Sequence, residues 1–275
     1  MEFIRALSER LRSMRARPRV LFWEADDPRM HEAIERLAEI VEPIVLNGAA
    51  CADAARLLHD GRADAAVGGA IASSAEFFRA GLKIVGLRDG CKTVSTAGIV
   101  QPRTESAANR PMIFADVGTV PEPSAEQLVD IAESTARTWR SLSDEEPVVA
   151  FLSSSTKGSA HAPRSGVIAD AIQLLAKRAP NIPSVGEVQF DAAVVPAIAR
   201  RKGVTSDRAG CANVLVFPDL NSANLGYKIA EHAGGAEVAA VTQGFARPWF
   251  DLSRGSSAQA IFATAILAAH AALER

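Results

Sequence analysis

The sequence predicts an α/β protein in which helices cover the faces of a mostly parallel sheet. Short β-rich runs alternate with segments of helical period along the chain, turn residues separate them, and no internal repeat is present. Strands that alternate with helices are expected to pair in parallel, because the connecting helix returns the chain to the starting edge of the sheet. Ligands of such sheets bind at the carboxyl ends of the strands. The loops that follow strands are therefore the first places to search for chemistry.

Strands are expected where apolar and β-branched residues form short uninterrupted runs. In chain order these runs are Arg19–Trp23, Pro43–Leu46, Ala63–Gly68, Val94–Val100, Pro111–Ala115, Val148–Leu152, Asn213–Phe217 and Val238–Thr242. The run NVLVF at Asn213–Phe217 is the clearest strand, and ADAAVG at Ala63–Gly68 is a weaker one.

Helices are expected where apolar residues recur with the spacing of one helical face. In chain order these segments are His31–Ile40, Cys51–His59, Ser74–Gly86, Pro123–Leu142, Val167–Ala179, Asp191–Lys202, Leu225–His232 and Ala258–Leu273. Ser124 precedes Glu126 and Gln127, which is typical of an N-cap followed by acidic and amide residues in the first turn. The Ala-rich last helix could be intramolecular core or part of a dimer interface.

Composition argues against several classes of protein. The chain has 275 residues, of which 48% are hydrophobic and 23% are charged, with a formal net charge of -2. This balance is not that of a disordered chain or of a general nucleic-acid-binding surface. The three cysteines form no CxxC pair, so we expect no zinc site, no disulfide framework and a reducing cytoplasm. We find no signal-peptide core and no apolar stretch near the roughly 18 residues of a membrane helix.

The first unusual post-strand loop is Ser153–Ser159, with the sequence SSSTKGS. Its hydroxyls, its glycine and Lys157 suit an anion such as phosphate. The loop is not a P-loop, because the pattern GxxxxGK[ST] is absent. A polar turn without a ligand is the alternative interpretation.

The second loop is Phe217–Lys228, with the sequence FPDLNSANLGYK. Pro218 and Asp219 end the strand, and Asn221 and Asn224 offer side-chain amides close to Lys228. The alternative interpretation is an Asx-rich turn that caps the next helix.

The third loop is Gln243–Ser257, with the sequence QGFARPWFDLSRGSS. Asp251, Ser253 and Arg254 lie together just before the last helix. Ser253 could hydrogen-bond a developing oxyanion, and Arg254 could hold a phosphate with two parallel hydrogen bonds. The alternative is an N-cap serine with a surface arginine.

Four motifs in this order resemble the phosphate acetyltransferase/phosphate butyryltransferase family: FLSSSTKGSA, VGEVQFDAAVVPAIA, ANVLVFPDLNSANLGYKIAEHAGGAE and TQGFARPWFDLSRGSS. The resemblance covers the chain from about Pro147, and MIFADVGTVPEPSAEQLVDIA and GRADAAVGGAIASSAEFFRAGLKIV upstream are also similar. It implies two three-layer α/β/α domains with an interdomain cleft, as in the isocitrate/isopropylmalate dehydrogenase-like fold. Residues 1–89 with 243–275 would form the first domain, and residues 90–242 the second.

The family transfers an acyl group reversibly between coenzyme A and phosphate, without a metal. The resemblance therefore implies an acyl-CoA:phosphate acyltransferase, a cytoplasmic homodimer that needs no cofactor besides its substrate coenzyme A. Its partners would be acyl-CoA and phosphate, with no nucleic acid and no membrane. Ser253 would stabilise the developing charge, Arg254 would position the phosphoryl group or the carbonyl, and Arg79 would bind an anion. The remaining residues implied in substrate binding are Ser155, Thr156, Lys157, Gly158, Asn221, Lys228, Gln243, Gly244 and Asp251.

Two departures from the family pattern leave a second interpretation open. Ala260 stands where the family has an Asp proposed to take the thiol proton, and the family's basic RKHKG-like stretch has no counterpart. Both favour a catalytically degenerate protein that binds acyl-CoA or an acyl phosphate in a regulatory role. Glu76, Asp251 or a histidine could serve as a replacement base, and the sequence alone does not place them.

Overall fold

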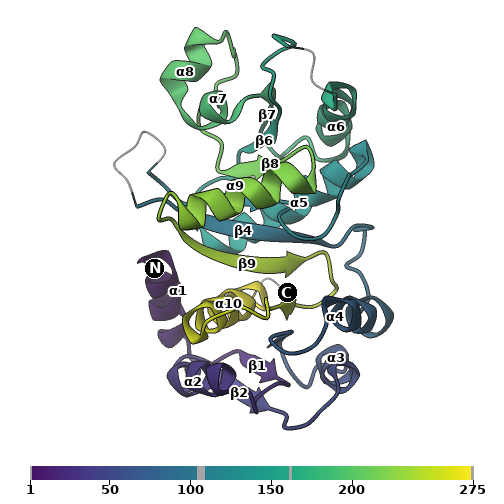
Figure 1. Cartoon of the computed structure of the whole chain (residues 1–275), viewed down its shortest axis with the longest axis vertical. Helices are drawn as coiled ribbons and strands as arrows, with labels where there is room; N and C mark the ends of the chain where they lie inside the picture. The colour runs from purple at the N-terminus through teal and green to yellow at the C-terminus, as the bar shows by residue number, and fades with distance from the viewer. Residues whose placement is uncertain (1, 104–108, 161–162, 274–275) are drawn as a thin grey trace. The chain divides into compact units, whose positions relative to one another are not determined.

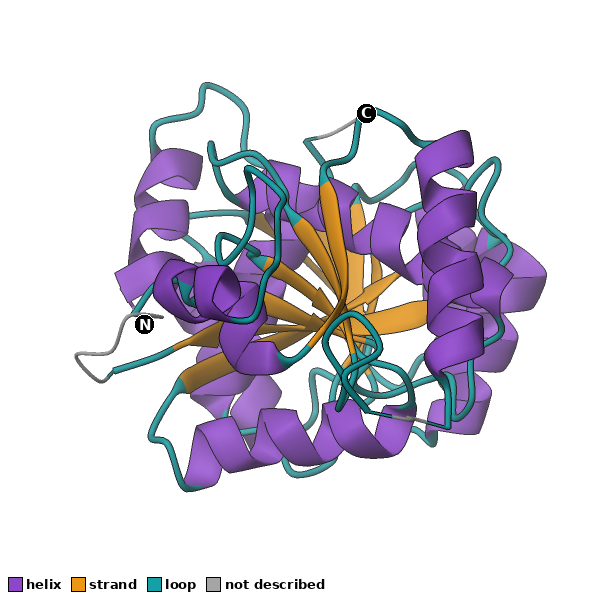
Figure 2. Ribbon diagram, turned by 90° about the horizontal axis from the view of Figure 1, so that it is seen from above, coloured by secondary structure: helices purple, strands orange, loops and turns teal. Residues whose placement is uncertain are grey.

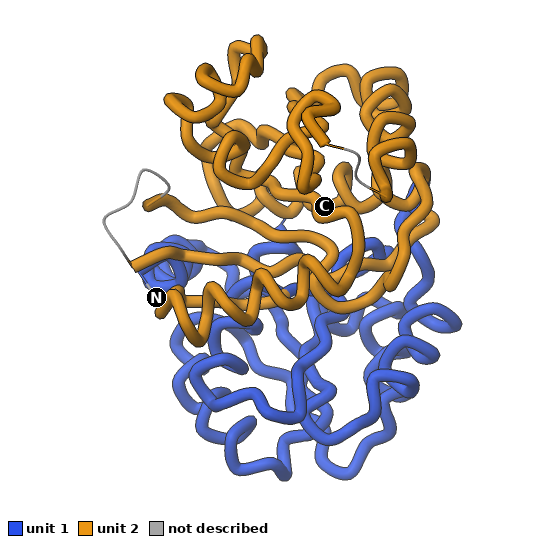
Figure 3. Tube along the Cα trace, turned by 45° about the horizontal axis from the view of Figure 1, so that its top comes forward, with its two compact units in different colours: residues 1–91, 241–275 blue, residues 92–240 orange. Residues whose placement is uncertain are grey.

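The computed structural model describes residues 2–103, 109–160 and 163–273. The chain divides into two compact units, unit 1 with residues 1–91 and 241–275, and unit 2 with residues 92–240 (Figure 3). The last helix therefore belongs to the same unit as the first strands, although most of the chain separates them in sequence.

Unit 1 contains a parallel sheet whose strand order, over its described residues, is β10-β3-β1-β2. The strands are β1 (Arg19–Phe22), β2 (Glu42–Val45), β3 (Ala65–Gly68) and β10 (Trp249–Asp251). The helices are α1 (Glu2–Arg12), α2 (Pro28–Leu37), α3 (Cys51–His59), α4 (Ser74–Ala80) with the π-helical turn η1 (Gly81–Val85), and α10 (Ala258–Ala271) (Figure 1). Every residue of β3 is buried, as expected for a central strand of a parallel sheet that is covered on both faces.

The Ala-rich helix α10 is part of the core of unit 1. It packs against α1, α2 and β3, and its residues from Ala263 to His270 are buried. The ring of His270 lies with Nε2 3.0 Å from the carbonyl oxygen of Leu7, and burial lowers the pKa of this histidine. Of the two roles expected for this helix, the structure thus supports intramolecular core.

Three stacked aromatic rings lie beside the strand ends of unit 1. The ring centroids of Trp23 and Trp249 are 4.6 Å apart, and those of Phe77 and Trp249 are 5.0 Å apart. Gly68, the last residue of β3, admits this stack, because a Cβ there would lie 2.2 Å from the Trp23 ring. The stack therefore fixes the ends of β1 and β3, from which the polar loops described below depart.

Unit 2 is built on a sheet with the order β7-β6-β8-β5-β4-β9 over its described residues. The strands are β4 (Ser95–Gln101), β5 (Met112–Ala115), β6 (Val149–Leu152), β7 (Ser184–Val188), β8 (Val214–Val216) and β9 (Glu237–Gln243), which ends in unit 1. The helices are α5 (Ala125–Leu142), α6 (Ser165–Arg178), α7 (Phe190–Val194), α8 (Pro196–Arg201) and α9 (Leu220–His232). Strands β7, β6, β8 and β5 pair in parallel, whereas β4 is antiparallel to β5. In Figure 2 helices flank the strands.

The mixed α/β fold predicted from the alternation of strands and helices is confirmed, with local corrections. Three elements were not predicted from the sequence, namely α1, β7 and β10. The N-terminal segment was tested only for a signal-peptide core, and the two strands are short and contain polar residues. The helix expected over Asp191–Lys202 is divided at Pro196, whose ring cannot continue the helix before it. Among the described residues, no helix has the length and apolar character needed to cross a membrane.

Candidate functional site

The SSSTKGS loop after β6 is held by the carboxylate of Glu187 on β7. Ser153 Oγ donates to Glu187 Oε1 at 2.8 Å, the backbone N–H of Gly158 donates to Oε2 at 3.3 Å, and the hydroxyl of Ser165 also donates. Burial raises the pKa of Glu187, but the hydrogen bonds from Ser165 and Ser153 outweigh it and hold this pKa below its usual range. Glu187 therefore fixes the loop and already uses some of the donors that an anion would need.

The predicted residues of this loop differ in accessibility. Ser155 and Thr156 are buried, and Thr156 Oγ1 accepts a hydrogen bond from the backbone N–H of Gln189 at 3.0 Å. Lys157 is exposed, has a left-handed backbone with φ 51°, and donates from Nζ to the carbonyl of Gly203 at 2.8 Å. Such backbone conformations cluster at functional sites and in switch regions. Lys157 is thus the cationic side chain that this loop presents to solvent.

The second predicted loop is largely helical, which corrects its description from the sequence. Asp219 accepts from the backbone N–H of Ser222 at 2.9 Å and caps α9, so the helix begins at Leu220 and includes Asn221. The preference of Asp219 for the N-cap position is therefore stronger here than the preference of the following asparagines for a turn. Asn221 and Lys228 are exposed and lie two helical turns apart, on one face of α9.

A pocket of about 640 Å³ joins these two segments within unit 2. Ser153 and Ser154, which follow β6, line it together with Pro218 and Asp219, which follow β8. Its further lining residues are Glu122, Leu152, Pro163, Arg164, Ile168, Phe190, Phe217 and Ser222. The volume and the mixture of aromatic walls with a few polar groups are typical of small-molecule sites.

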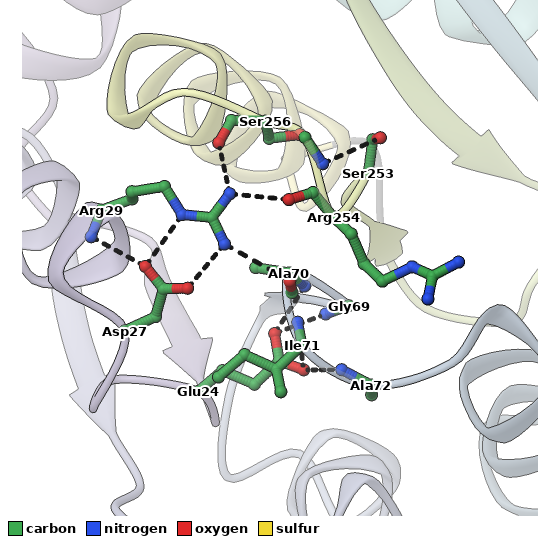
Figure 4. A network of polar contacts seen from close by, with 11 residues as sticks. Glu24, Asp27, Arg29, Gly69, Ala70, Ile71, Ala72, Ser253, Arg254 and Ser256 are labelled. Atoms are coloured by element: carbon green, nitrogen blue, oxygen red, sulfur yellow. Dashed lines mark hydrogen bonds and ion pairs between the residues drawn. The ribbon is translucent and has the colours of Figure 1, made fainter.

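In unit 1, Ser253 and Arg254 lie on the exposed turn between β10 and α10 (Figure 4). The guanidinium of Arg29 fixes this turn, because its Nη1 donates to the carbonyl oxygens of Arg254 and Ser256, both at 2.8 Å. Arg29 is itself held by Asp27, with Nη2 2.6 Å from Oδ2, and this hydrogen bond holds the pKa of Asp27 below its usual range. The backbone of the turn is therefore fixed while the Ser253 and Arg254 side chains stay accessible.

The buried carboxylate of Glu24, just after β1, holds a second loop beside this turn (Figure 4). It accepts hydrogen bonds from four consecutive backbone N–H groups, those of Gly69, Ala70, Ile71 and Ala72, at 2.8, 2.6, 3.2 and 2.7 Å. Arg29 Nη2 also approaches the carbonyl of Ala70, at 3.4 Å. Glu24 and Arg29 thus join the loop after β3 to the turn before α10.

Asp251, the last residue of β10, lies against this loop. A Cβ at Gly69 would be 2.1 Å from Asp251 Oδ1, so a glycine is needed there for the carboxylate to fit. Burial, and then the negative charge of Glu24, raise the pKa of Asp251 to about 7. This carboxyl group therefore exchanges its proton near neutral pH.

The other predicted residues of unit 1 lie on separate elements. Arg79 is exposed in the last turn of α4, one turn after Glu76. Gln243 is buried at the end of β9, and Gly244 has φ 101°. Ala260 is in the first turn of α10, where its backbone N–H donates to the N-cap Ser257 Oγ at 3.2 Å.

Asp251, Ser253 and Arg254 thus lie in unit 1, and Ser155 to Gly158, Asn221 and Lys228 lie in unit 2. Sequence reasoning missed Glu24, Asp27, Arg29 and Glu187. The first three belong to the segment WEADDPR, which follows β1. This segment is a post-strand loop like the three that were singled out, so the same rule could have found it.

Comparisons with known proteins agree on one family. Residues 39–269 match the family model described as phosphate acetyl/butaryl transferase. The phosphate acetyltransferase of Paracoccus denitrificans is 46% identical over 211 residues, which are 76% of this chain and 66% of that protein. That of Acetivibrio thermocellus is 40% identical over 215 residues, 78% of this chain and 65% of that protein. The chain thus spans slightly less than two thirds of the length of these curated relatives.

The fold agrees with the sequence match. The crystal structure of a phosphotransacetylase from Streptococcus pyogenes superposes with a TM-score of 0.88 at 30% identity, covering 100% of this chain and 99% of that one. Its similarity extends over both units and so includes the N-terminal residues that the family model leaves out. The chain therefore belongs to the phosphate acetyl/butaryl transferase family.

Proposed function

We propose that this chain is an acyl-CoA:phosphate acyltransferase that moves an acyl group reversibly between coenzyme A and phosphate. Membership of the family supports the reaction. The observation that carries it is the turn with Ser253 and Arg254, which has a fixed backbone and two exposed polar side chains. Groups that are held before the reaction begins lower the barrier most when they face the charge that develops in the transition state.

In the direction of thioester synthesis, the thiolate of coenzyme A attacks the carbonyl carbon of an acyl phosphate. Negative charge develops on the carbonyl oxygen and then on the departing phosphate. We assign Ser253 to hydrogen-bonding this charge and Arg254 to positioning the phosphoryl group or the carbonyl. Arg79, exposed on α4, is assigned to binding of the anionic substrate.

We assign further substrate contacts to predicted residues of both units. Lys157, exposed with Asn221 and Lys228 in unit 2, supplies charge for the phosphate groups of coenzyme A. Ser155, Thr156 and Gly158 shape the loop that carries Lys157. In unit 1, Gln243, Gly244 and Asp251 are the remaining substrate-binding assignments.

Finer properties of fold, assembly and cofactor use are also part of the proposal. Each unit is a three-layer α/β/α domain, and the two are arranged with a cleft as in the isocitrate/isopropylmalate dehydrogenase-like fold. The protein is a cytoplasmic homodimer and needs no metal or cofactor, since coenzyme A is a substrate. Light scattering tests the dimer, and an unchanged rate after treatment with a chelator tests the independence from metal. A crystal structure with coenzyme A bound tests the arrangement of the units.

The activity is tested by mixing the purified protein with coenzyme A and acetyl, propionyl or butyryl phosphate and following thioester formation. We expect turnover with at least one of them, and a loss of about 10²–10³-fold in Ser253→Ala, as for other donors to an oxyanion. Calorimetric titration with acetyl-CoA accompanies the assay. Binding without turnover on any acyl phosphate would reject the enzyme and favour the regulatory binding protein.

A further inference from the structure

The proposed reaction needs a group that takes the proton of the coenzyme A thiol. A free thiol has a pKa of about 8.5, so it is mostly protonated at neutral pH and needs a base to become a nucleophile. Ala260 carries only a methyl group, and its backbone N–H is used by the helix cap. The acceptor therefore has to be sought among the carboxylates near Ser253.

We propose that the carboxylate of Asp251 is the catalytic base that accepts the thiol proton, with Glu24 as the residue that positions and tunes it. This inference rests on the proposed function and assigns a role that Asp251 does not have as a substrate-binding residue. It is carried by the position of Asp251 in the chain, by the contacts of its carboxylate oxygens and by the charges around it.

The position of Asp251 is fixed from both sides. Its backbone N–H donates to Thr242 Oγ1 at 3.1 Å, and the N–H of the next residue, Leu252, donates to the carbonyl of Gly68 at 2.8 Å. Ser253 follows Asp251 by two residues, so the base and the proposed oxyanion donor leave the same strand end. The residue as a whole keeps partial exposure, although its Oδ1 is buried.

The carboxylate itself has an unsatisfied oxygen. Asp251 Oδ1 is buried and has no hydrogen-bond partner among the described residues, although it packs against Gly69. The backbone donors of this loop are taken by Glu24, which accepts the N–H of Gly69 and of the three residues after it. A buried acceptor that lacks a donor favours the arrival of a proton.

The surrounding charges are mostly negative. Glu24 after β1 acts electrostatically on Asp251, and Asp251 acts with Glu24 and with Glu76 on α4 on the thiol of Cys51 on α3. Burial, together with the charges of Glu24, Glu76 and Asp251, raises the pKa of Cys51 to about 12, so this thiol stays protonated and does not compete as a base. The partly exposed cation Arg29 on α2 is engaged by Asp27 and by backbone carbonyls.

Burial and the negative charge of Glu24 raise the pKa of Asp251 to about 7, although hydrogen bonds from Leu252 and Ser74 oppose this rise, and the value supports the assignment made from geometry. A base works best when its pKa is near the operating pH, because it is then both deprotonated and able to hold the proton. In the step itself, the S–H bond breaks and its proton moves to Asp251. The thiolate then forms the C–S bond, while the C–O bond of the acyl phosphate breaks and phosphate leaves with the electron pair.

The test measures kcat/KM for thioester synthesis between pH 5.5 and 9 in wild type and in Asp251→Asn. We expect the wild-type kcat/KM to rise with pH through about 7. In Asp251→Asn, kcat/KM at pH 8 should be about 10²–10⁴-fold lower and should no longer show this rise. The matched control is Asp60→Asn, an exposed carboxylate at the end of α3, which should keep the wild-type profile. The double variant Asp251→Asn/Ala260→Asp, with a new carboxylate in the first turn of α10, should recover part of the rate.

Each outcome is decisive. A wild type that is inactive on every acyl phosphate overturns the proposed function and this inference with it. An active wild type with an equally active Asp251→Asn overturns the inference alone. If Asp251→Asn does not fold, Glu24→Gln is measured instead. Removing the neighbouring negative charge must move the acidic limb of the kcat/KM profile to lower pH, and an acidic limb at the wild-type pH overturns the inference.

Discussion

Replacing Asp251 by Asn should stabilise unit 1, and more at pH 8 than at pH 5. The pKa of Asp251 is about 7 in the folded protein and near 3.8 for an ordinary Asp, as in the unfolded chain. Between these two values the folded state holds a proton that the unfolded state has released. Wild-type stability therefore falls as the pH rises from about 4 to about 7 and is constant above that range. The side chain of Asn does not titrate, so Asp251→Asn removes this pH dependence of stability.

The size of the effect follows from the two pKa values. One pKa unit corresponds to about 1.4 kcal/mol, and about two units of the shift lie between pH 5 and pH 7. The stability difference between Asp251→Asn and wild type should therefore be larger at pH 8 than at pH 5 by roughly 3 kcal/mol, and less to the extent that water reaches the partly exposed side chain.

Urea unfolding at the two pH values, followed by tryptophan fluorescence, measures this difference. In a Trp139→Phe background the remaining tryptophans, Trp23 and Trp249, both belong to unit 1, so the signal reports that unit. Asp60→Asn in the same background controls for general effects of removing a charge. Equal stability differences for Asp251→Asn at both pH values would refute the reasoning, because they would mean that Asp251 does not titrate in this range.

Two further variants test contacts that position the loops, and a third tests the packing of α9 against β4. Arg29→Met, which loses the hydrogen bonds to the carbonyls of Arg254 and Ser256, should lower kcat about 10²-fold in protein that remains folded at the assay temperature; wild-type kcat would contradict the positioning role. Glu187→Gln should weaken the hold on the SSSTKGS loop and speed tryptic cleavage after Lys157, whereas an unchanged cleavage rate would show that the loop does not depend on this charge. Gly98→Ala should lower the free energy of unfolding by about 1–3 kcal/mol in urea titrations, because a Cβ there would lie 2.4 Å from the Tyr227 ring; undiminished stability would contradict this overlap.

Sequence patterns were sufficient for the elements whose residues interact locally. The apolar runs at Val148–Leu152 and Asn213–Phe217 form β6 and β8, and Ser124 caps α5 through a capping box with Gln127. These features depend on side-chain periodicity and on backbone groups a few residues away. The start of α9 was placed too late, because Asp219 is both a turn residue and a strong N-cap, and the sequence does not show which role applies.

By itself, the sequence determined the α/β class, the strand-end position of the SSSTKGS segment, and the family resemblance. Only the tertiary structure decided that Glu24 binds the loop after β3, more than 40 residues away, and that Arg29 holds a turn 225 residues later. It alone also gave Asp251 its raised pKa, because burial and the field of Glu24 act through space. Local patterns report which element a residue joins, whereas hydrogen-bond partners and proton affinity depend on groups that only folding brings together.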